Sequence, residues 1–411
     1  MIEITAIFLV LTTLLAYFNY RFIGLPITIG VMATSLIVSL IIIFLNIVGL
    51  DFGLYRKFEL MLSHINFSEI LMNGMLSFLL FAGALHIDIN QLKNYKWQVL
   101  SLAFISTFLS TIIIGITIWY ILPWIGLKLP FLYCLLFGAL ISPTDPIAVI
   151  GILKSAGVPK NLETMIAGES LFNDGIGVVV FSILLSILLL GKNPSVYEGS
   201  MLLIHEAGGG LIFGLALGYV TFLLLKSIDN YQLEVMLTLA CVMGGYVLAS
   251  KLHVSGPLAM VIAGLYIGSQ ARKLAMSKTT RVYLDMFWET LDGILNAILF
   301  VLIGMEVMLI AFDFNIAIAA LISILLVLIA RALTVWMPVR ILKFYFNLPK
   351  GAGLVLTWGG IRGGISVALA LSLPLGMERE IVLALTYCVV ISSILIQGLT
   401  IGKLARKIIQ T

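Results

Sequence analysis

Charged residues are scarce in this sequence, and their scarcity excludes a soluble globular protein. Asp, Glu, Lys and Arg together make up only 11% of the 411 residues, whereas a soluble domain carries roughly 25%. The three cysteines, Cys134, Cys241 and Cys388, each lie inside an apolar run without CxxC spacing or a neighbouring histidine. This placement indicates neither a disulfide framework nor a metal site, and no cofactor is expected.

Hydrophobic residues are abundant instead: they make up 61% of the sequence, and the mean hydropathy is +1.15. Apolar runs of about 20 residues recur from end to end, and each is long enough to cross ~30 Å of hydrocarbon. We therefore predict an all-α polytopic membrane protein, a single transmembrane domain over residues 1–411 with about thirteen spans. The expected spans are residues 3–20, 24–46, 68–86, 97–122, 131–153, 161–190, 200–226, 231–250, 256–271, 285–311, 314–343, 352–374 and 381–403.

The distribution of basic residues predicts the orientation of these spans. With the N-terminus outside and the C-terminus in the cytoplasm, 16 Lys and Arg residues fall in inner loops and the tail. Six fall in outer loops: Arg56, Lys57, Lys128, Lys192, Lys251 and Arg379. Cytoplasmic loops are enriched in Lys and Arg, so this orientation is favoured, and the scattered basic residues give no sign of nucleic-acid binding.

Five charged residues lie at membrane depth in this assignment: Asp145, Glu169, Asp174, Arg331 and Arg362. A charge in hydrocarbon costs at least ~2.5–3.5 kcal/mol, so each one calls for a structural or functional reason.

The fifth span contains Asp145 in the segment SPTDP. Pro143 and Pro146 cannot donate to the carbonyls four residues earlier, and their rings clash with the preceding turn. A single proline would favour a simple kink, but two prolines around Thr144 and Asp145 predict an opened helix. Unwound backbone at this depth is tolerated only where it is buried in protein or lines a cavity.

The sixth and twelfth spans carry the other polar groups near this depth. In GESLFND, helical spacing places Ser170 and Asp174 on one stripe, and Glu169 and Asn173 on the adjacent one. The alternative is an interfacial loop, and the sixth span is long enough to begin with an interfacial turn. In GGIRGG, four glycines around Arg362 weaken the helix. Close helix packing through small residues also fits these glycines, but it does not explain the arginine.

The two interrupted spans occupy matching positions in the chain. The fifth is the middle of spans four to six, and the twelfth is the middle of spans eleven to thirteen. The offset of seven is odd, so the two triples cross the membrane in opposite senses. Interrupted helices at matching positions of inverted repeats indicate the binding site of a secondary transporter.

Five stretches resemble the monovalent cation:proton antiporter-1 family, the NhaP/NHE type of Na⁺/H⁺ exchanger: SPTDPIAV, GESLFNDG, SGPLAMVIAGL, WETLDGILNAILFVLIGMEV and TWGGIRGGISVALALSLP. The resemblance implies a secondary transporter rather than an enzyme, exchanging Na⁺ or Li⁺ for H⁺ across the plasma membrane in pH homeostasis. It implies a homodimer with two crossed discontinuous helices. Transport (core) helices would cover about 97–190 and 314–403, and scaffold and dimer helices about 3–86 and 200–311.

The resemblance also implies roles for the residues of the fifth and sixth spans. Asp174 would carry both the cation and the proton, with Asn173 as its partner. Ser170 and Thr144 would be co-ligands, so that Na⁺ binds at Asp174, Ser170 and Thr144. Asp145 would line the crossing of the broken helices.

The same resemblance implies that Glu169 pairs with Arg331. Because the fixed charges at membrane depth must largely cancel, Asp145 is expected to lie near Arg362. A buried carboxylate avoids bearing an unpaired charge, so H⁺ and Na⁺ are expected to compete for Asp174. One carrier carboxylate beside a neutral amide predicts electroneutral 1:1 exchange.

Some alternatives and departures stay open. A K⁺/H⁺ exchanger of the same fold fits the sequence. An intramembrane aspartyl protease using Asp145 and Asp174 is disfavoured, because the YD and GxGD pair of such enzymes is absent. Many relatives carry a glutamate in the third span where this chain has Ala82. Asp292 and Glu289 in WETLDGILN resemble a family motif, and from the residues alone they could equally cap or cross-link the tenth span. Glu306 is expected to be interfacial.

Overall fold

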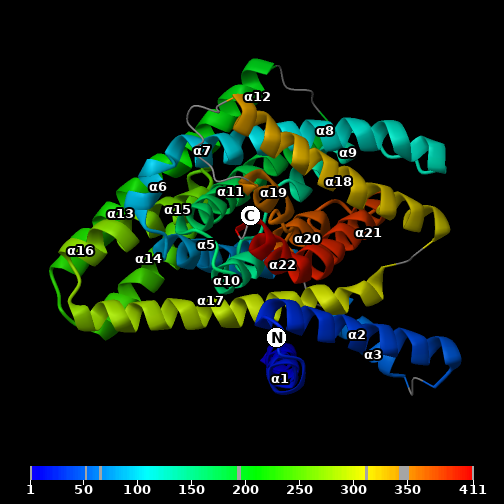
Figure 1. Ribbon diagram of the computed structural model, residues 1–411, viewed down its shortest axis with the longest axis horizontal. Coiled ribbons are helices and arrows are strands. Elements are labelled where there is room, and N and C mark those ends of the chain that lie inside the picture. Colours follow the sequence, from blue (N-terminus) through cyan, green and yellow to red (C-terminus); the bar gives the residue numbers. More distant parts are fainter. Residues whose placement is uncertain are drawn as a thin grey trace.

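The computed structural model describes residues 2–50, 53–63, 67–191, 196–310, 313–341 and 351–409 (Figure 1). The predicted all-helical fold is confirmed over these ranges, which contain no strand. Lys192, position 311 at the end of the tenth predicted span, and positions 342–343 at the end of the eleventh lie outside the described residues.

The α-helices follow one another closely along the chain. They are α1 (Ile2–Phe18), α2 (Ile27–Val48), α3 (Leu54–Ser63), α4 (Phe67–Ile70), α5 (Leu76–Leu85), α6 (Ile89–Asn94), α7 (Lys96–Leu100), α8 (Ser106–Ile121), α9 (Phe131–Ile141), α10 (Ile147–Ser155), α11 (Lys160–Leu190), α12 (Val196–Leu203), α13 (Gly209–Lys226), α14 (Tyr231–Lys251), α15 (Gly256–Tyr266), α16 (Arg272–Leu274), α17 (Lys278–Glu306), α18 (Phe314–Ile341), α19 (Ala352–Trp358), α20 (Gly364–Leu371), α21 (Met377–Ser392) and α22 (Gly398–Ile409).

Short π-helical or 3₁₀ turns, labelled η, continue or join several of these helices. They are η1 (Asn19–Ile23), η2 (Leu71–Met75), η3 (Ser101–Ile105), η4 (Leu122–Ile125), η5 (Ile204–Gly208), η6 (Ile267–Ala271), η7 (Val307–Leu309) and η8 (Ser393–Gln397).

Nine helices of the described part are long and apolar enough to cross a membrane. Two shorter apolar helices, α5 and α9, accompany them. Each of the thirteen predicted spans overlaps one helix or a pair of consecutive helices. The number of crossings itself remains a prediction.

Two predicted spans are interrupted, as the sequence indicated. The fifth is divided into α9 and α10, with residues 142–146 non-helical between them, and the twelfth into α19 and α20, with residues 359–363 between them. The sixth differs from expectation, because α11 is continuous from Lys160 to Leu190 without an interfacial turn. Pro159 immediately before it has its φ preset for the start of a helix.

The broken helices lie at the centre of the bundle (Figure 1). α9 packs against α8, α11, α20 and α21, and α18 packs against α8, α19 and α21. The long helix α17 runs along the lower side of the view in Figure 1 and contacts α2, α5, α14 and α20. α17, which corresponds to the tenth predicted span and belongs to neither triple of spans, therefore contacts α20 of the broken twelfth span.

Glu306 at the end of α17 differs from its predicted interfacial position. Its side chain is buried, and the Tyr387 hydroxyl on α21 donates a hydrogen bond to it. This contact joins α17 to α21, which explains how a carboxylate is retained there inside the protein.

Candidate functional site

The break between α9 and α10 follows from its two prolines. Pro146 has no N–H to donate to the Ser142 carbonyl, which a continuous helix would have used. Arg362, from the break between α19 and α20, donates from Nη1 to this carbonyl and, at 3.0 Å, to that of Pro143. The buried guanidinium thus satisfies the Ser142 carbonyl that Pro146 leaves free and a second carbonyl of the same break.

The two breaks also exchange a backbone hydrogen bond. The Asp145 N–H donates to the Ile361 carbonyl at 2.7 Å. A Cβ added to Gly363 would lie only 2.6 Å from the Asp145 Cβ, so this glycine allows the second break to approach the first. The two unwound segments therefore touch at Asp145, which is the crossing implied by the family resemblance.

Asn173 on α11 forms two hydrogen bonds with Thr144 in the first break. Its Oδ1 accepts from the Thr144 N–H at 3.2 Å, and its Nδ2 donates to the Thr144 hydroxyl at 2.9 Å. The Thr144 hydroxyl also lies 3.0 Å from the Ser170 hydroxyl. Each of these three side chains is at most 2% exposed. The structure thus joins Thr144, Ser170 and Asn173 in one hydrogen-bonded network.

The two predicted aspartates share a cavity of about 60 Å³. Its lining includes Asp145, Asp174, Asn296, Gly363 and Ser366, with leucines over much of the remaining wall. A cavity of this size holds a small ion or a few water molecules. Thr144 and Ser170 are not among the residues that line this cavity.

Glu169 and Arg331 form a buried ion pair between α11 and α18. Arg331 donates to both carboxylate oxygens, at 3.0 Å from Nη2 to Oε2 and more closely from Nη1 to Oε1. Nη2 also donates to the Leu356 carbonyl of α19 at 3.0 Å. The side chains are 1% and 6% exposed. A fork-to-fork pair of this kind fixes geometry as well as charge.

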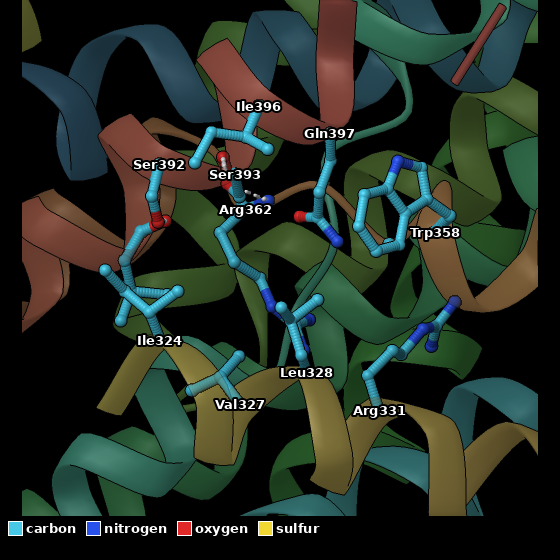
Figure 2. A pocket seen from close by; sticks show the side chains of 12 residues that line it. Ile324, Val327, Leu328, Arg331, Trp358, Arg362, Ser392, Ser393, Ile396 and Gln397 are labelled. Atoms are coloured by element: carbon cyan, nitrogen blue, oxygen red, sulfur yellow. Dashed lines mark hydrogen bonds between the residues drawn. The ribbon is translucent and has the colours of Figure 1, made fainter. Parts of the chain in front are cut away.

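A second small cavity, of about 40 Å³, lies beside the second break, and Figure 2 shows side chains that line it. It is lined by both buried arginines, Arg331 and Arg362, and by Ser393, whose hydroxyl accepts from the Arg362 N–H at 3.1 Å. Neither Asp145 nor Asp174 lines it. This cavity therefore belongs to the supporting structure of the crossing and not to the aspartate site.

A larger open cavity, of about 420 Å³, adjoins the aspartate cavity. The two share lining residues Gly83, Pro146 and Leu171. Lys154 and Ala82 also line the larger cavity, and Lys154 belongs to a loop predicted to be cytoplasmic. The larger cavity therefore lies beside the aspartate cavity on the side that the charge bias predicts to be cytoplasmic.

Sequence reasoning missed two polar residues of the aspartate cavity, Asn296 and Ser366. Asn296 lies on α17, is 1% exposed, and lines the same cavity as Asp145 and Asp174. The signal was the spacing Asp292–Asn296 in WETLDGILN, where the amide follows the carboxylate by one helical turn. Asp292 indeed cross-links within α17, because it accepts from the Asn296 amide.

The chemistry of this crossing is that of hard oxygen donors. Carboxylate, hydroxyl and amide oxygens suit small, hard cations. Among the described residues, no group of three His, Cys, Asp or Glu side chains could hold a resident metal ion. Two carboxylates in a small cavity, at a point where two helices unwind and cross, are groups whose chemistry suits one small cation.

Known proteins place this arrangement in a family. The family model "Sodium/hydrogen exchanger, transmembrane" matches residues 9–407, and the chain belongs to that family. The chain is 53% identical to a protein of Pseudomonas aeruginosa named Na(+)/H(+) antiporter NhaP, over 99% of this chain and 97% of that protein. It is 37% identical to the Na(+)/H(+) antiporter NhaH of Halobacillus dabanensis, over 83% of this chain and 84% of that one.

A solved structure shares the fold. The sodium proton antiporter MjNhaP1 of Methanocaldococcus jannaschii superposes with a TM-score of 0.77, covering 100% of this chain and 99% of its own, at 21% identity. The predicted resemblance to the antiporter family and its fold is therefore confirmed.

Proposed function

We propose that this protein is a secondary transporter that exchanges Na⁺ or Li⁺ for H⁺, with Asp174 as the carrier that both ions share. The observation that carries the proposal is the small cavity where Asp174 and Asp145 meet at the crossing of two broken helices. Family membership and the antiporter names of relatives sharing up to 53% identity support the same assignment.

The hydrogen-bond network suggests how the proposed ligands divide their roles. Asp174 would supply the charge that the cation neutralises, with Asp145 across the cavity. Both the oxygen and the nitrogen of the Asn173 side chain form hydrogen bonds with Thr144. Asn173 would therefore orient the break rather than bind the cation directly. Thr144 and Ser170 would bind Na⁺ only after a small shift that turns their hydroxyls into the cavity.

The cycle would alternate access by moving the core against the scaffold. We propose core helices at about 97–190 and 314–403 and scaffold and dimer helices at about 3–86 and 200–311. The open cavity that adjoins the aspartates would then be the cytoplasmic entrance, with the N-terminus outside and the C-terminus inside. A homodimer in the plasma membrane completes the proposal.

The experiment that tests this function is proton-gradient dissipation in proteoliposomes. Purified protein is reconstituted, an inside-acidic gradient is imposed, and Na⁺, Li⁺ and K⁺ are added in turn. We expect dissipation with Na⁺ and Li⁺. Dissipation with K⁺ alone would show that K⁺, and not Na⁺ or Li⁺, is the transported cation. No dissipation with any of the three would contradict cation–proton exchange altogether.

Stoichiometry gives a separate prediction. One carboxylate that alternates between Na⁺ and H⁺ presents the same net charge in both crossings, provided that Asp145 and Glu169 keep constant protonation. Each net charge moved would couple to ~2.3 kcal/mol per 100 mV, so a cycle that moves none should ignore the membrane potential. We expect no steady Na⁺-dependent current on a solid-supported membrane, and unchanged rates under an imposed K⁺/valinomycin potential. A potential-dependent rate would show that a second carboxylate carries protons, with Asp145 the first to test.

A further inference from the structure

Asn296 projects from α17 into the aspartate cavity. It is 1% exposed and lines the cavity together with Asp145 and Asp174. α17 belongs to neither of the triples that contain the broken helices, but it contacts α20 directly. Asn296 is therefore the polar group that a third part of the molecule contributes to this cavity.

The orientation of the Asn296 amide is determined by its partners. The side-chain nitrogen lies 2.9 Å from the Asp292 backbone carbonyl and 3.0 Å from Asp292 Oδ1. A backbone carbonyl only accepts hydrogen bonds, so the nitrogen and not the oxygen must face it. The side-chain oxygen consequently points away from Asp292.

That oxygen has no hydrogen-bond partner within the described part of the chain, although it is buried. Leaving a buried acceptor unsatisfied is unfavourable, so a native protein supplies a partner for it. The other side-chain oxygens that line the cavity are those of Asp145, Asp174 and Ser366, and leucines form much of the rest. None of these groups forms a hydrogen bond with the Asn296 oxygen in the described part of the chain, so we take its partner from the contents of the cavity.

A carboxamide oxygen is a ligand for hard cations. It is neutral, so it strengthens cation binding without changing the charge that crosses the membrane. Asp292, which accepts hydrogen bonds from the Asn296 amide, lines the larger open cavity that adjoins the aspartate cavity. The Asp292–Asn296 pair thus extends along α17 from the larger cavity to the aspartates.

We propose that Asn296 is a cation-coordinating residue of the transport site, positioned by Asp292. This inference rests on the proposed function, because it concerns the same cavity and the same cation. Asn296 contributes to affinity for the transported cation, and the proton is carried without it.

The test compares wild type with Asn296→Ala and Asn296→Ser in proteoliposomes, measuring the half-saturating Na⁺ concentration and the maximal rate. Loss of one ligand oxygen from a charged partner is expected to raise the half-saturating concentration about tenfold. The maximal rate should stay within about twofold of wild type. Thermal stabilisation of the detergent-solubilised protein by Na⁺ should require correspondingly higher Na⁺, which gives a readout independent of transport. Asp292→Ala should shift both readouts in the same direction but less, because the backbone carbonyl still holds the amide.

Trp288→Phe provides the matched control. It removes another buried side-chain hydrogen bond of α17, the 3.1 Å donation from the indole to the Thr238 hydroxyl, away from the cavity. It should lower stability and leave the half-saturating Na⁺ concentration unchanged. If both Asn296 variants fold and keep wild-type Na⁺ dependence, the oxygen binds only water and the inference is wrong. A wild type that exchanges no cation would instead contradict the proposed function.

Discussion

Asp174→Ala should reduce Na⁺-driven proton-gradient dissipation to the level of empty liposomes. Asp174 lies in a small cavity walled largely by leucines, alongside Asp145. Without its carboxylate, the site has neither the charge that offsets a dehydrated cation nor the group that takes up the exchanged proton. Asp174→Asn, which keeps the shape, should be equally inactive because an amide carries no exchangeable negative charge.

The control for this prediction is Asp229→Ala, which removes an exposed aspartate from the loop between α13 and α14. It should leave exchange intact. Size-exclusion profiles of the Asp174 variants should match wild type, and their melting temperatures should be no lower, because burying an unpaired carboxylate costs free energy. Normal Na⁺-driven dissipation in a folded Asp174→Ala protein would remove Asp174 from the mechanism.

Glu169→Gln and Arg331→Ala should each lower the free energy of unfolding by ~3–5 kcal/mol, because each leaves its partner charged and buried. The pair joins α11 to α18, and its third hydrogen bond reaches the Leu356 carbonyl of α19. The double variant should be less destabilised than the sum of the two single variants, since neither charge then remains unpaired. Melting in detergent measures all three.

The Arg272–Asp285 ion pair is the matched control. Its side chains are 30% and 35% exposed, and a pair in contact with water contributes only ~0–1 kcal/mol. Asp285→Asn should therefore barely change the melting temperature. Strict additivity in the Glu169 and Arg331 cycle would mean that the two charges do not stabilise each other.

The positions of the helix breaks could be predicted because their causes are local. Pro143 and Pro146 remove backbone donors and clash with the preceding turn wherever they occur in a helix. The glycines around Arg362 lower helix propensity at the matching position. The polar stripe of α11 was equally visible, because helical periodicity alone places Ser170 and Asp174 on one face.

The partners of the broken backbone could not be predicted, because they come from residues far apart in sequence. Arg362 was expected near Asp145, and it binds the carbonyls of Ser142 and Pro143 just before it. Asn173 was expected as a partner of Asp174, and its amide is occupied by Thr144. Sequence shows which backbone groups are freed, but the tertiary packing decides which side chain satisfies them.

Two buried polar groups of α17 were misjudged or missed for the same reason. Glu306 was expected to be interfacial, yet it accepts from Tyr387, 81 residues later. Asn296 could not be recognised from the sequence, because the cavity around it is formed by segments between positions 76 and 366 that are far apart in the chain. The apolar pattern of α17 predicts that the helix is buried, but it does not predict the cavity into which the Asn296 amide projects.

The central claim, that Na⁺ and H⁺ share Asp174, is tested most directly by the pH dependence of the half-saturating Na⁺ concentration. Competition for one carboxylate predicts that this concentration rises as pH falls, approaching about tenfold per pH unit once protons occupy the site. The maximal rate at saturating Na⁺ should stay constant over the same range, because enough Na⁺ displaces the proton. A half-saturating concentration that is independent of pH, with only the maximal rate changing, would show that the proton and Na⁺ bind at different groups and would contradict the account.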